Sequence, residues 1–190
     1  WLGPVQYRPY HHQYTHTVYR GWYDFGGGAM ADMGVYSLWP VFTGLNLDSP
    51  ISAEAYASHR CSIIESVSKK VNNDYSYPTA CQLRFRFAAK GDMPELDMFW
   101  YEGGMKPRLP KELESADVKV SEEGILWVGD KGGIIAGFNG GNPKLFIGGK
   151  SKPLFGKEPE ENKSPDDVWV DSFLEGRESP GSFLSTGAIS

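Results

Sequence analysis

The chain has 190 residues and a formal net charge of −5, with 40% hydrophobic and 23% charged residues. This is the composition of a globular chain long enough to bury a core without disulfide or metal support. Its lysines and arginines are scattered, and no stretch approaches the ~18 consecutive apolar residues of a membrane span. We therefore expect neither a nucleic-acid surface nor a membrane segment. Because it starts at Trp1 and stops where a helical pattern begins, near Ser190, we expect a fragment of a longer protein.

Residues 1–28 are rich in Tyr, His, Pro and Gly and show no periodicity. This composition predicts an ordered irregular segment that is packed by its aromatic rings.

From Ala29 to about Leu45 the spacing of the apolar residues predicts a helix. Its apolar residues form two neighbouring stripes, so we expect it to be buried around most of its circumference: Met30, Met33, Leu38, Val41 and Leu45 in one, Val35, Trp39 and Phe42 in the other. Pro40 inside this helix predicts a kink or a break near Leu38.

Strand patterns follow the turn at residues 48–50. Three segments predict an antiparallel meander: a weak candidate at 51–61, a clear alternation at 79–89, and 95–101 after a turn at 90–92. A polar, proline-containing excursion occupies 103–123. Three further short strands are predicted at 124–128, 133–138 and 144–147, with hairpin turns at 130–132 and 139–142.

The C-terminal part begins with a charged, proline-containing linker, residues 150–163. Ser164 then supplies an N-cap and Pro165 a first helical residue, which predicts a helix from Pro165 to Leu174 that ends at Gly176. The order of one helix, many antiparallel strands and one helix indicates an α+β fold, with an open, mainly antiparallel sheet packed on helices.

The stretch RGWYDFGGGAMADMGVY, residues 20–36, places an acid and a phenol one helical turn apart after three glycines. Asp32 and Tyr36 share one face of the predicted helix. A carboxylate on so apolar a helix is costly to bury unless it is paired or faces a pocket. Glycines 26–28 permit unusual backbone angles and a close approach of another surface. The pattern predicts a helix N-terminus at the floor of a cleft.

A purely structural interpretation of the same residues stays open. Asp32 would then bind the glycine loop or pair with Arg20, and Tyr36 would be a core tyrosine with a satisfied hydroxyl. The glycines do not predict a phosphate-binding loop. They do not form a GxGxxG motif after a strand, and they lack the GKS or GKT ending of a P-loop.

Three other groups of residues have side chains that could carry chemistry. His11, His12 and His16 have spacings that can share an ion, but without a carboxylate in the cluster we expect pocket-lining or surface histidines and no metal site. Cys61 and Cys81 are too few for a disulfide framework or a zinc site, so reduced thiols are expected, with pairing in an oxidising compartment as the alternative. An aromatic-rich segment is typical of sugar-ring stacking or of a plain packing layer: Trp1, Tyr7, Tyr10, Tyr14, Tyr19, Trp22 and Tyr23.

Five segments resemble, in order, the C-terminal domain of the Gfo/Idh/MocA oxidoreductases, the glucose–fructose oxidoreductase and inositol dehydrogenase family: WLGPVQYRPYH, RGWYDFGGGAMADMGVYSLWPVF, DMFWYEGGMKP, GILWVGDKGGI and SFLEGRESPGSF. The resemblance spans nearly the whole chain. It implies an α+β domain whose open sheet forms the interface of a homo-oligomer. In the full-length protein, it implies an N-terminal Rossmann domain that binds NAD or NADP and takes a hydride from a sugar, a polyol or a derivative.

The resemblance also implies site residues. The family has a D-x-x-x-H motif on the helix after a GGG loop, which makes Asp32 the catalytic aspartate and puts Tyr36 where the histidine is expected. A phenol is a poorer base than an imidazole at neutral pH, so altered or lost dehydrogenase chemistry stays open. Substrate-binding residues are expected at His12, Arg20, Trp22 and Tyr23.

Residues 1–190 are thus interpreted as a single substrate-binding and oligomerisation domain, without the Rossmann domain, its catalytic lysine or a C-terminal helix. Two alternatives remain. One is a non-catalytic carbohydrate-binding or assembly module, motivated by Tyr36, and the other is a lyase or hydrolase that acts through a transient keto-sugar with the same residues. The sequence does not choose between a cytoplasmic and a periplasmic location.

Overall fold

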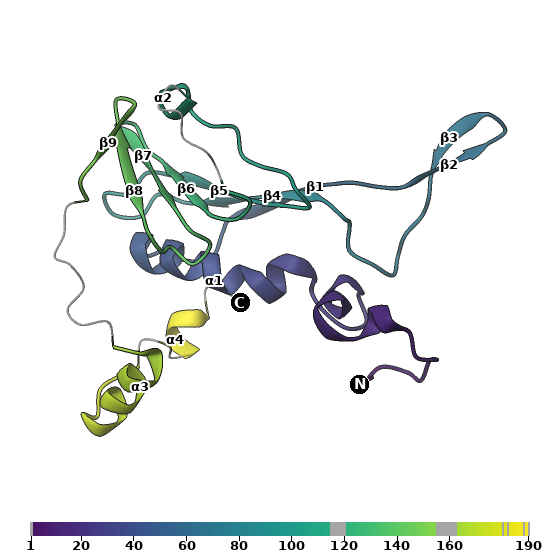
Figure 1. Cartoon of the computed structure of the whole chain (residues 1–190), viewed down its shortest axis with the longest axis horizontal. Coiled ribbons are helices and arrows are strands. Elements are labelled where there is room, and N and C mark those ends of the chain that lie inside the picture. Colours follow the sequence, from purple (N-terminus) through teal and green to yellow (C-terminus); the bar gives the residue numbers. More distant parts are fainter. Residues whose placement is uncertain are drawn as a thin grey trace. The chain divides into compact units, whose positions relative to one another are not determined.

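The computed structural model describes residues 2–114, 121–154, 163–179, 181, 183–187 and 189 (Figure 1). Its contacts divide the chain into two compact units. The first contains Trp1–Val35 and Pro50–Arg108, and the second contains Tyr36–Ser49 and Leu109–Ser190. Helix α1, Gly28–Leu45, begins in the first unit and ends in the second. The assignment of residues 1–190 to one substrate-binding domain stays a prediction.

The N-terminal segment of the first unit forms two 3-10 helices, η1 (His12–Tyr14) and η2 (His16–Gly21), where the sequence predicted irregular structure. Such short helices bury no continuous stripe and therefore leave no readable period. Aromatic packing orders the segment, as predicted: the Trp22 ring lies 5.3 Å from that of Tyr14 and 6.1 Å from that of Tyr75, between ring centroids.

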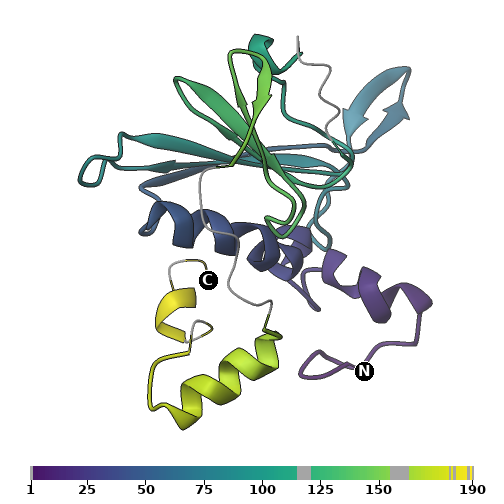
Figure 2. The ribbon, with the colours of Figure 1, turned by 60° about the vertical axis from the view of Figure 1, so that its left-hand side comes forward.

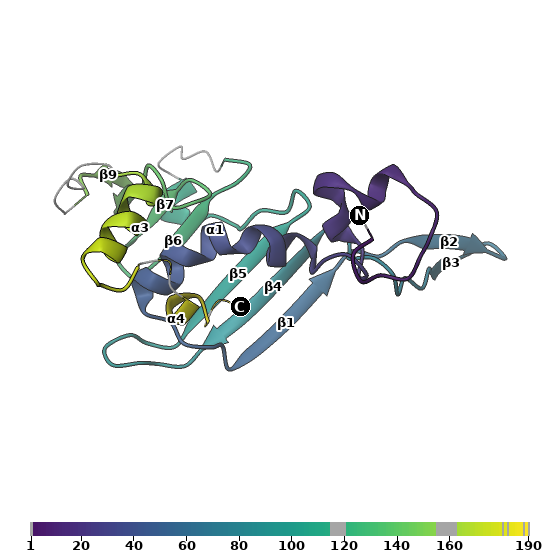
Figure 3. The same cartoon turned by 90° about the horizontal axis from the view of Figure 1, so that it is seen from below.

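The main sheet of the first unit contains β1 (Ser52–Ala57), β4 (Cys81–Phe87) and β5 (Leu96–Glu102). The strands are antiparallel in the order β1-β4-β5 (Figure 3). The register places Leu83 between Ala55 and Trp100, and Arg84 between Glu54 and Phe99. One face of the sheet is therefore apolar, and the opposite face mixes charged and aromatic side chains.

A hairpin of β2 (Cys61–Ile64) and β3 (Val67–Lys70) stands between β1 and β4 in the sequence and pairs with neither. The predicted strand at 51–61 is thus two strands with a break between them. The hairpin escaped prediction because its turn residues Glu65 and Ser66 take φ values of +52° and +65°, which such turns usually reserve for Asn, Asp or Gly.

Helix α1 runs without interruption through Pro40, so of the two predicted alternatives the break is wrong and the kink stays a prediction. Leu38, Val41 and Phe42 are buried beside this proline, and their packing outweighs the hydrogen bond that a proline cannot donate. Burial around most of the circumference is also wrong for this chain, because Val35 is 42% and Tyr36 55% exposed.

The sheet of the second unit contains β6 (Ile125–Val128), β7 (Gly132–Ala136), β8 (Lys144–Ile147) and β9 (Lys150–Lys152) (Figure 2). The four strands are antiparallel in sequence order. The short helix α2 (Lys111–Glu114) lies in the predicted excursion, and β9 opens the predicted linker. Residues 115–120 and 155–162 of those two segments lie outside the described residues.

Helix α3, Pro165–Leu174, has the predicted bounds. The Ser164 hydroxyl accepts a hydrogen bond from the Asp167 amide at 3.1 Å, and Gly176 leaves the helix with a φ of +66°. A last short helix, α4, spans Phe183–Thr186. The open antiparallel sheets and few helices confirm the predicted α+β class. Among the helices that the structure describes, none has the length and apolar character needed to cross a bilayer.

Candidate functional site

The glycine loop, residues 26–28, brings the chain close to two neighbouring groups of the first unit. A Cβ atom added to Gly26 would lie 2.7 Å from the Arg20 Cα, and one added to Gly28 would lie 3.1 Å from the Tyr77 ring. Gly28 also has a φ of +82°, which a side chain would strain. The predicted close approach at this loop is confirmed, and the surfaces that approach are Arg20 and Tyr77.

Arg20 and Asp32 are brought together across this loop. The Arg20 Nη1 atom forms an ion pair with the Asp32 Oδ2 atom, and both side chains are partly exposed. This is the pairing that the structural interpretation of the sequence considered. Among the described residues, the second carboxylate oxygen of Asp32, Oδ1, has no hydrogen-bond partner. The arginine therefore fixes one oxygen and leaves the other available to a ligand.

Tyr36 lies one turn further along α1, in the second unit. Its ring lies 6.2 Å from that of Phe138, and its 55% exposure rules out a core tyrosine. The next residue, Ser37, is buried and donates a hydrogen bond from its hydroxyl to the Phe138 carbonyl at 2.6 Å. Ser37 thus anchors this part of the helix to the segment after β7, while the phenol of Tyr36 faces outward.

Trp22 and Tyr23 have different surroundings. The Trp22 indole donates its N–H to the Gln13 carbonyl at 3.0 Å, which leaves it no free donor. Tyr23 packs edge-on against Tyr77, with ring centroids 4.6 Å apart, and is nearly half exposed. Since Tyr77 also contacts Gly28, Tyr23 lies next to the glycine loop. Trp22 holds the segment together, and of these two rings Tyr23 has the larger free surface.

His12 lies in η1 and is exposed, with its ring stacked on that of His11 at 4.4 Å between centroids. It does not take part in the Arg20–Asp32 pair. Within the part of the chain that the structure describes, no three His, Cys, Asp or Glu residues are grouped so that they could hold a metal ion.

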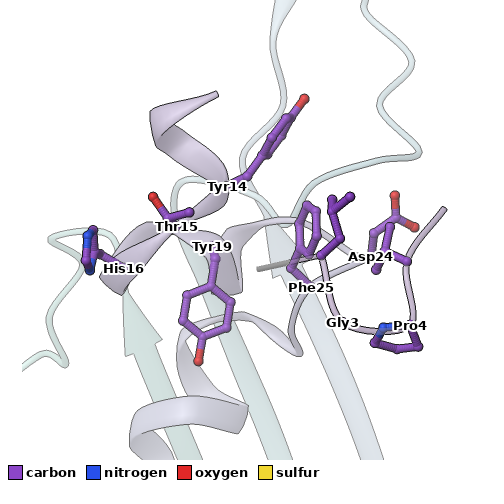
Figure 4. Close-up of a pocket in the computed structure, with 10 residues that line it drawn as sticks. Gly3, Pro4, Tyr14, Thr15, His16, Tyr19, Asp24 and Phe25 are labelled. Carbon is purple, nitrogen blue, oxygen red and sulfur yellow. The ribbon is translucent and has the colours of Figure 1, made fainter. Parts of the chain in front are cut away.

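A cavity of about 460 Å³ lies in the N-terminal segment, and none of the residues predicted as a site lines it (Figure 4). Its walls combine aromatic rings with a few polar groups: Leu2, Gly3, Pro4, Val5, Tyr14, Thr15, His16, Tyr19, Asp24 and Phe25. Figure 4 shows Asp24 beside the turn of Gly3 and Pro4, with His16 at the opposite end of the group.

Arg8 holds one wall of this cavity in place. Its guanidinium forms an ion pair with Asp24 and lies over the rings of Tyr14 and Phe25, 5.5 and 5.2 Å from their centroids. The hydrogen bond to Asp24 raises the pKa of Arg8 above its ordinary value. From the sequence, Tyr14 and Tyr19 were predicted only as members of an aromatic-rich segment, and the pairing of Arg8 with Asp24 was not predicted. Sixteen residues separate that pair, a distance at which no periodic pattern signals a contact.

The two cysteines, both in the first unit, are free thiols. Cys61 is exposed on the hairpin, whereas Cys81 is buried at the start of β4. Burial raises the pKa of the Cys81 thiol to about 12, and a hydrogen bond to Glu102 adds to that effect. The expectation of unpaired thiols is met in the structure, and the buried thiol is the less reactive of the two.

Comparison with protein families shows the family to which the chain belongs. The model of the oxidoreductase family C-terminal alpha/beta domain, GFO_IDH_MocA_C2, matches residues 1–121. The chain belongs to the Gfo/Idh/MocA oxidoreductase family. A comparison with curated proteins gave no match. The matched range of this Gfo/Idh/MocA domain includes the glycine loop, Arg20, Asp32 and Tyr36, and also the cavity.

The Gfo/Idh/MocA family implies a nicotinamide cofactor, which can be tested against the glycine loop of this chain. A dinucleotide site needs glycines whose missing side chains leave room for a pyrophosphate after a strand. Here that room is taken by Arg20 at Gly26 and by the Tyr77 ring at Gly28. The residues before the loop form a turn and η2 instead of a strand. The glycine loop of this domain therefore does not fit a dinucleotide.

Proposed function

We propose that this chain is the substrate-binding domain of an oxidoreductase that acts on a sugar, a polyol or a derivative with NAD or NADP. Its family membership supports the oxidoreductase class. The observation that carries the proposal is the placement of Asp32 directly after the glycine loop, with one oxygen held by Arg20. The hydride acceptor would be supplied by a nicotinamide when that cofactor is bound, and the glycine loop of this domain does not hold it.

Each residue of this domain has a distinct role in the proposal. The Oδ1 atom of Asp32 accepts the hydrogen bond of the substrate hydroxyl and takes its proton, while Arg20 keeps the carboxylate oriented. The exposed phenol of Tyr36 donates a hydrogen bond to a substrate oxygen in place of the family's histidine. Tyr23 offers an aromatic face to the sugar ring and His12 a polar edge. Trp22 supports η1, which carries His12, through its hydrogen bond to the Gln13 carbonyl.

The test compares Asp32→Asn with a matched control. The full-length protein is given NAD or NADP and a panel of sugars and polyols, and reduction of the cofactor is followed. We expect Asp32→Asn to lower kcat by about 100-fold or more, since general base catalysis contributes about 10² to 10⁴-fold. Asp171→Asn is the control, because Asp171 lies on α3, is no part of the proposed site, and pairs with Lys163 at 2.7 Å. Full activity of Asp32→Asn would refute the assignment.

A second candidate function is a carbohydrate-binding module without turnover. The observation behind it is Tyr36, which replaces the expected histidine and is 55% exposed. Calorimetric binding of a sugar by the full-length protein, with no cofactor reduction and no altered product, would favour this candidate. Measurable reduction of NAD or NADP would exclude it, and product analysis would separate an oxidoreductase from a lyase or hydrolase.

We also propose that the domain forms a homo-oligomer through the polar face of the sheet β1-β4-β5. This face carries the aromatic side chains Tyr56, Phe99 and Tyr101, of which Tyr56 and Phe99 are exposed. Between them, Arg84 forms ion pairs with Glu54 and Asp97 at 3.5 and 2.7 Å. Exposed aromatic rings beside ion-paired side chains are the combination of residues found in specific protein–protein interfaces.

Phe99 provides the test of this proposal, because its ring is 43% exposed and an interface on this face would bury it. Phe99→Asp should therefore weaken self-association, measured by sedimentation velocity.

A further inference from the structure

The β2–β3 hairpin forms an arm that is held together by backbone hydrogen bonds between its two strands. We define the arm as residues 58–72. Its two strands pair from Cys61 with Lys70 to Ile64 with Val67, and the Val71 amide extends this ladder to the Arg60 carbonyl at 2.8 Å. Views from two directions show the strands beyond the end of the main sheet of the same unit (Figures 1 and 3).

The base of the arm is tied to that sheet. The Ser58 amide donates to the Ala80 carbonyl at 2.9 Å, and the Ser58 hydroxyl accepts from the Ala80 amide at 3.1 Å. The same hydroxyl lies 3.2 Å from that of Thr79. These contacts fix the direction in which the arm leaves the sheet, so the arm is a positioned element with a free tip.

The tip exposes apolar side chains that nothing in the first unit covers. Ile63, Ile64 and Val67 are 75%, 47% and 56% exposed, and every residue from 51 to 70 is exposed. An isolated two-stranded hairpin is only marginally stable in water, because it has no second layer to bury its apolar residues. Both of its outer edges also present backbone groups of the kind that pair with another chain.

The formal charge of the arm favours a partner surface that is acidic. Arg60, Lys69 and Lys70 with Glu65 give residues 58–72 a formal charge of +2, whereas the rest of the chain carries −7. A basic arm with an apolar tip is complementary to an acidic surface that has an apolar patch. A second copy of this chain provides the acidic charge.

We propose that the arm docks onto a second copy of this chain, and that two arms are exchanged about a twofold axis. In such an arrangement, each copy contributes the same surface, so one arm contact is necessarily made twice. The apolar tip residues are buried against the partner, and Lys69 and Lys70 pair with acidic groups of the partner. This contact is separate from the polar face of the sheet β1-β4-β5 and does not depend on the proposed catalytic role of Asp32.

The first test measures the protection of Cys61 in the unmodified protein. Cys61 shares a face of the hairpin with Ile63, and it is exposed, whereas Cys81 is buried. The labelling rate of Cys61 by a maleimide is followed in the full-length protein over a dilution series, with peptide mapping to assign the label. We expect labelling to slow at least tenfold at concentrations where the protein associates.

The second test uses variants and measures mass by sedimentation velocity. Ile64→Asp and the double variant Lys69→Glu/Lys70→Glu should each weaken association at least tenfold. Val128→Asp is the control, since Val128 at the end of β6 is 61% exposed and lies in the other unit. Circular dichroism establishes that each variant is folded.

Several results would overturn the proposal. A protein that stays monomeric at all concentrations has no partner copy for the arm. An oligomer in which Cys61 labels at the monomer rate has its interface elsewhere. If Phe99→Asp dissociates the oligomer while the arm variants keep wild-type mass, the sheet face alone is the interface. Protection of Cys61 that does not change on dilution would place the arm against its own molecule.

Discussion

The ion pair between Arg20 and Asp32 joins the end of η2 to the first turns of α1 across the glycine loop. Arg20 also occupies the space that a side chain at Gly26 would take. The conformation of the loop and the orientation of the carboxylate are therefore set by the same arginine. A change at either residue should disturb the other.

The first prediction concerns Arg20 as the positioning residue of Asp32. Arg20→Gln should lower kcat/KM for the sugar or polyol by about 10 to 100-fold, because a misplacement of about 1 Å can cost that much. Arg20→Lys should restore part of the loss, since lysine keeps the charge but not the planar geometry. The losses in Arg20→Gln and Asp32→Asn should be far from additive in the double variant. Additive losses would mean that the two residues act independently.

The second prediction concerns Gly26. A methyl group there would lie 2.7 Å from the Arg20 backbone, which cannot swing aside as a side chain could. Gly26→Ala should lower the free energy of unfolding by about 1–3 kcal/mol, as overpacking does in other proteins. Gly44→Ala is the control, because Gly44 is exposed in α1 with open space around it, and alanine should gain about 0.5–1 kcal/mol there. Urea unfolding measures both, and equal effects would refute the steric explanation.

Elements with strong local signals were predicted well from the sequence. The bounds of α3 follow from Ser164, Pro165 and Gly176, whose capping roles depend on neighbours a few residues away. Strand β4 alternates cleanly because one face of its sheet is apolar and the other carries Arg84 and Arg86. The fold class follows from such segments, since each carries its own period.

Features that depend on contacts between distant residues were not predictable. The path of α1 through Pro40 depends on buried packing around it, and the β2–β3 turn uses Glu65 and Ser66 without a glycine or asparagine signal. The candidate site also combines a feature with a local sequence signal and contacts between distant residues. The glycine loop was readable from composition alone, but the Arg20–Asp32 pair was only one of two alternatives for Asp32, and the Arg8–Asp24 pair was not foreseen.

The third prediction concerns Ser37, the buried hydroxyl beside Tyr36. Its bond to the Phe138 carbonyl holds α1 to the turn after β7. Ser37→Ala should cost about 1–3 kcal/mol of stability, because it leaves a part-buried carbonyl without its donor. Thr43→Ala is the control, since the Thr43 hydroxyl bonds the Trp39 carbonyl at 2.6 Å on an exposed part of the same helix. A loss in Thr43→Ala as large as that in Ser37→Ala would contradict the prediction.

The fourth prediction concerns the buried thiol of Cys81 and alkaline pH. Burial, with help from Glu102, raises the pKa of this thiol from 9.0 to about 12 in the folded chain. Above pH 9 the unfolded chain loses the thiol proton while the folded chain keeps it, so the unfolded state binds fewer protons and stability falls as pH rises. The contribution of the buried, protonated Cys81 thiol to the stability of the fold is therefore complete below pH 9, and it is lost progressively between pH 9 and about 12.

Cys81→Ala tests this by removing the titrating group. The variant should show a shallower decline in the free energy of unfolding over that alkaline range, measured by urea unfolding at several pH values. Cys61→Ser is the control, because Cys61 is exposed and should leave the slope unchanged. Reactivity gives a second readout: a maleimide should label Cys61 rapidly in the folded protein and Cys81 only after unfolding. Rapid labelling of Cys81 in the folded protein, or an unchanged slope in Cys81→Ala, would show that the thiol is not shielded as the structure indicates.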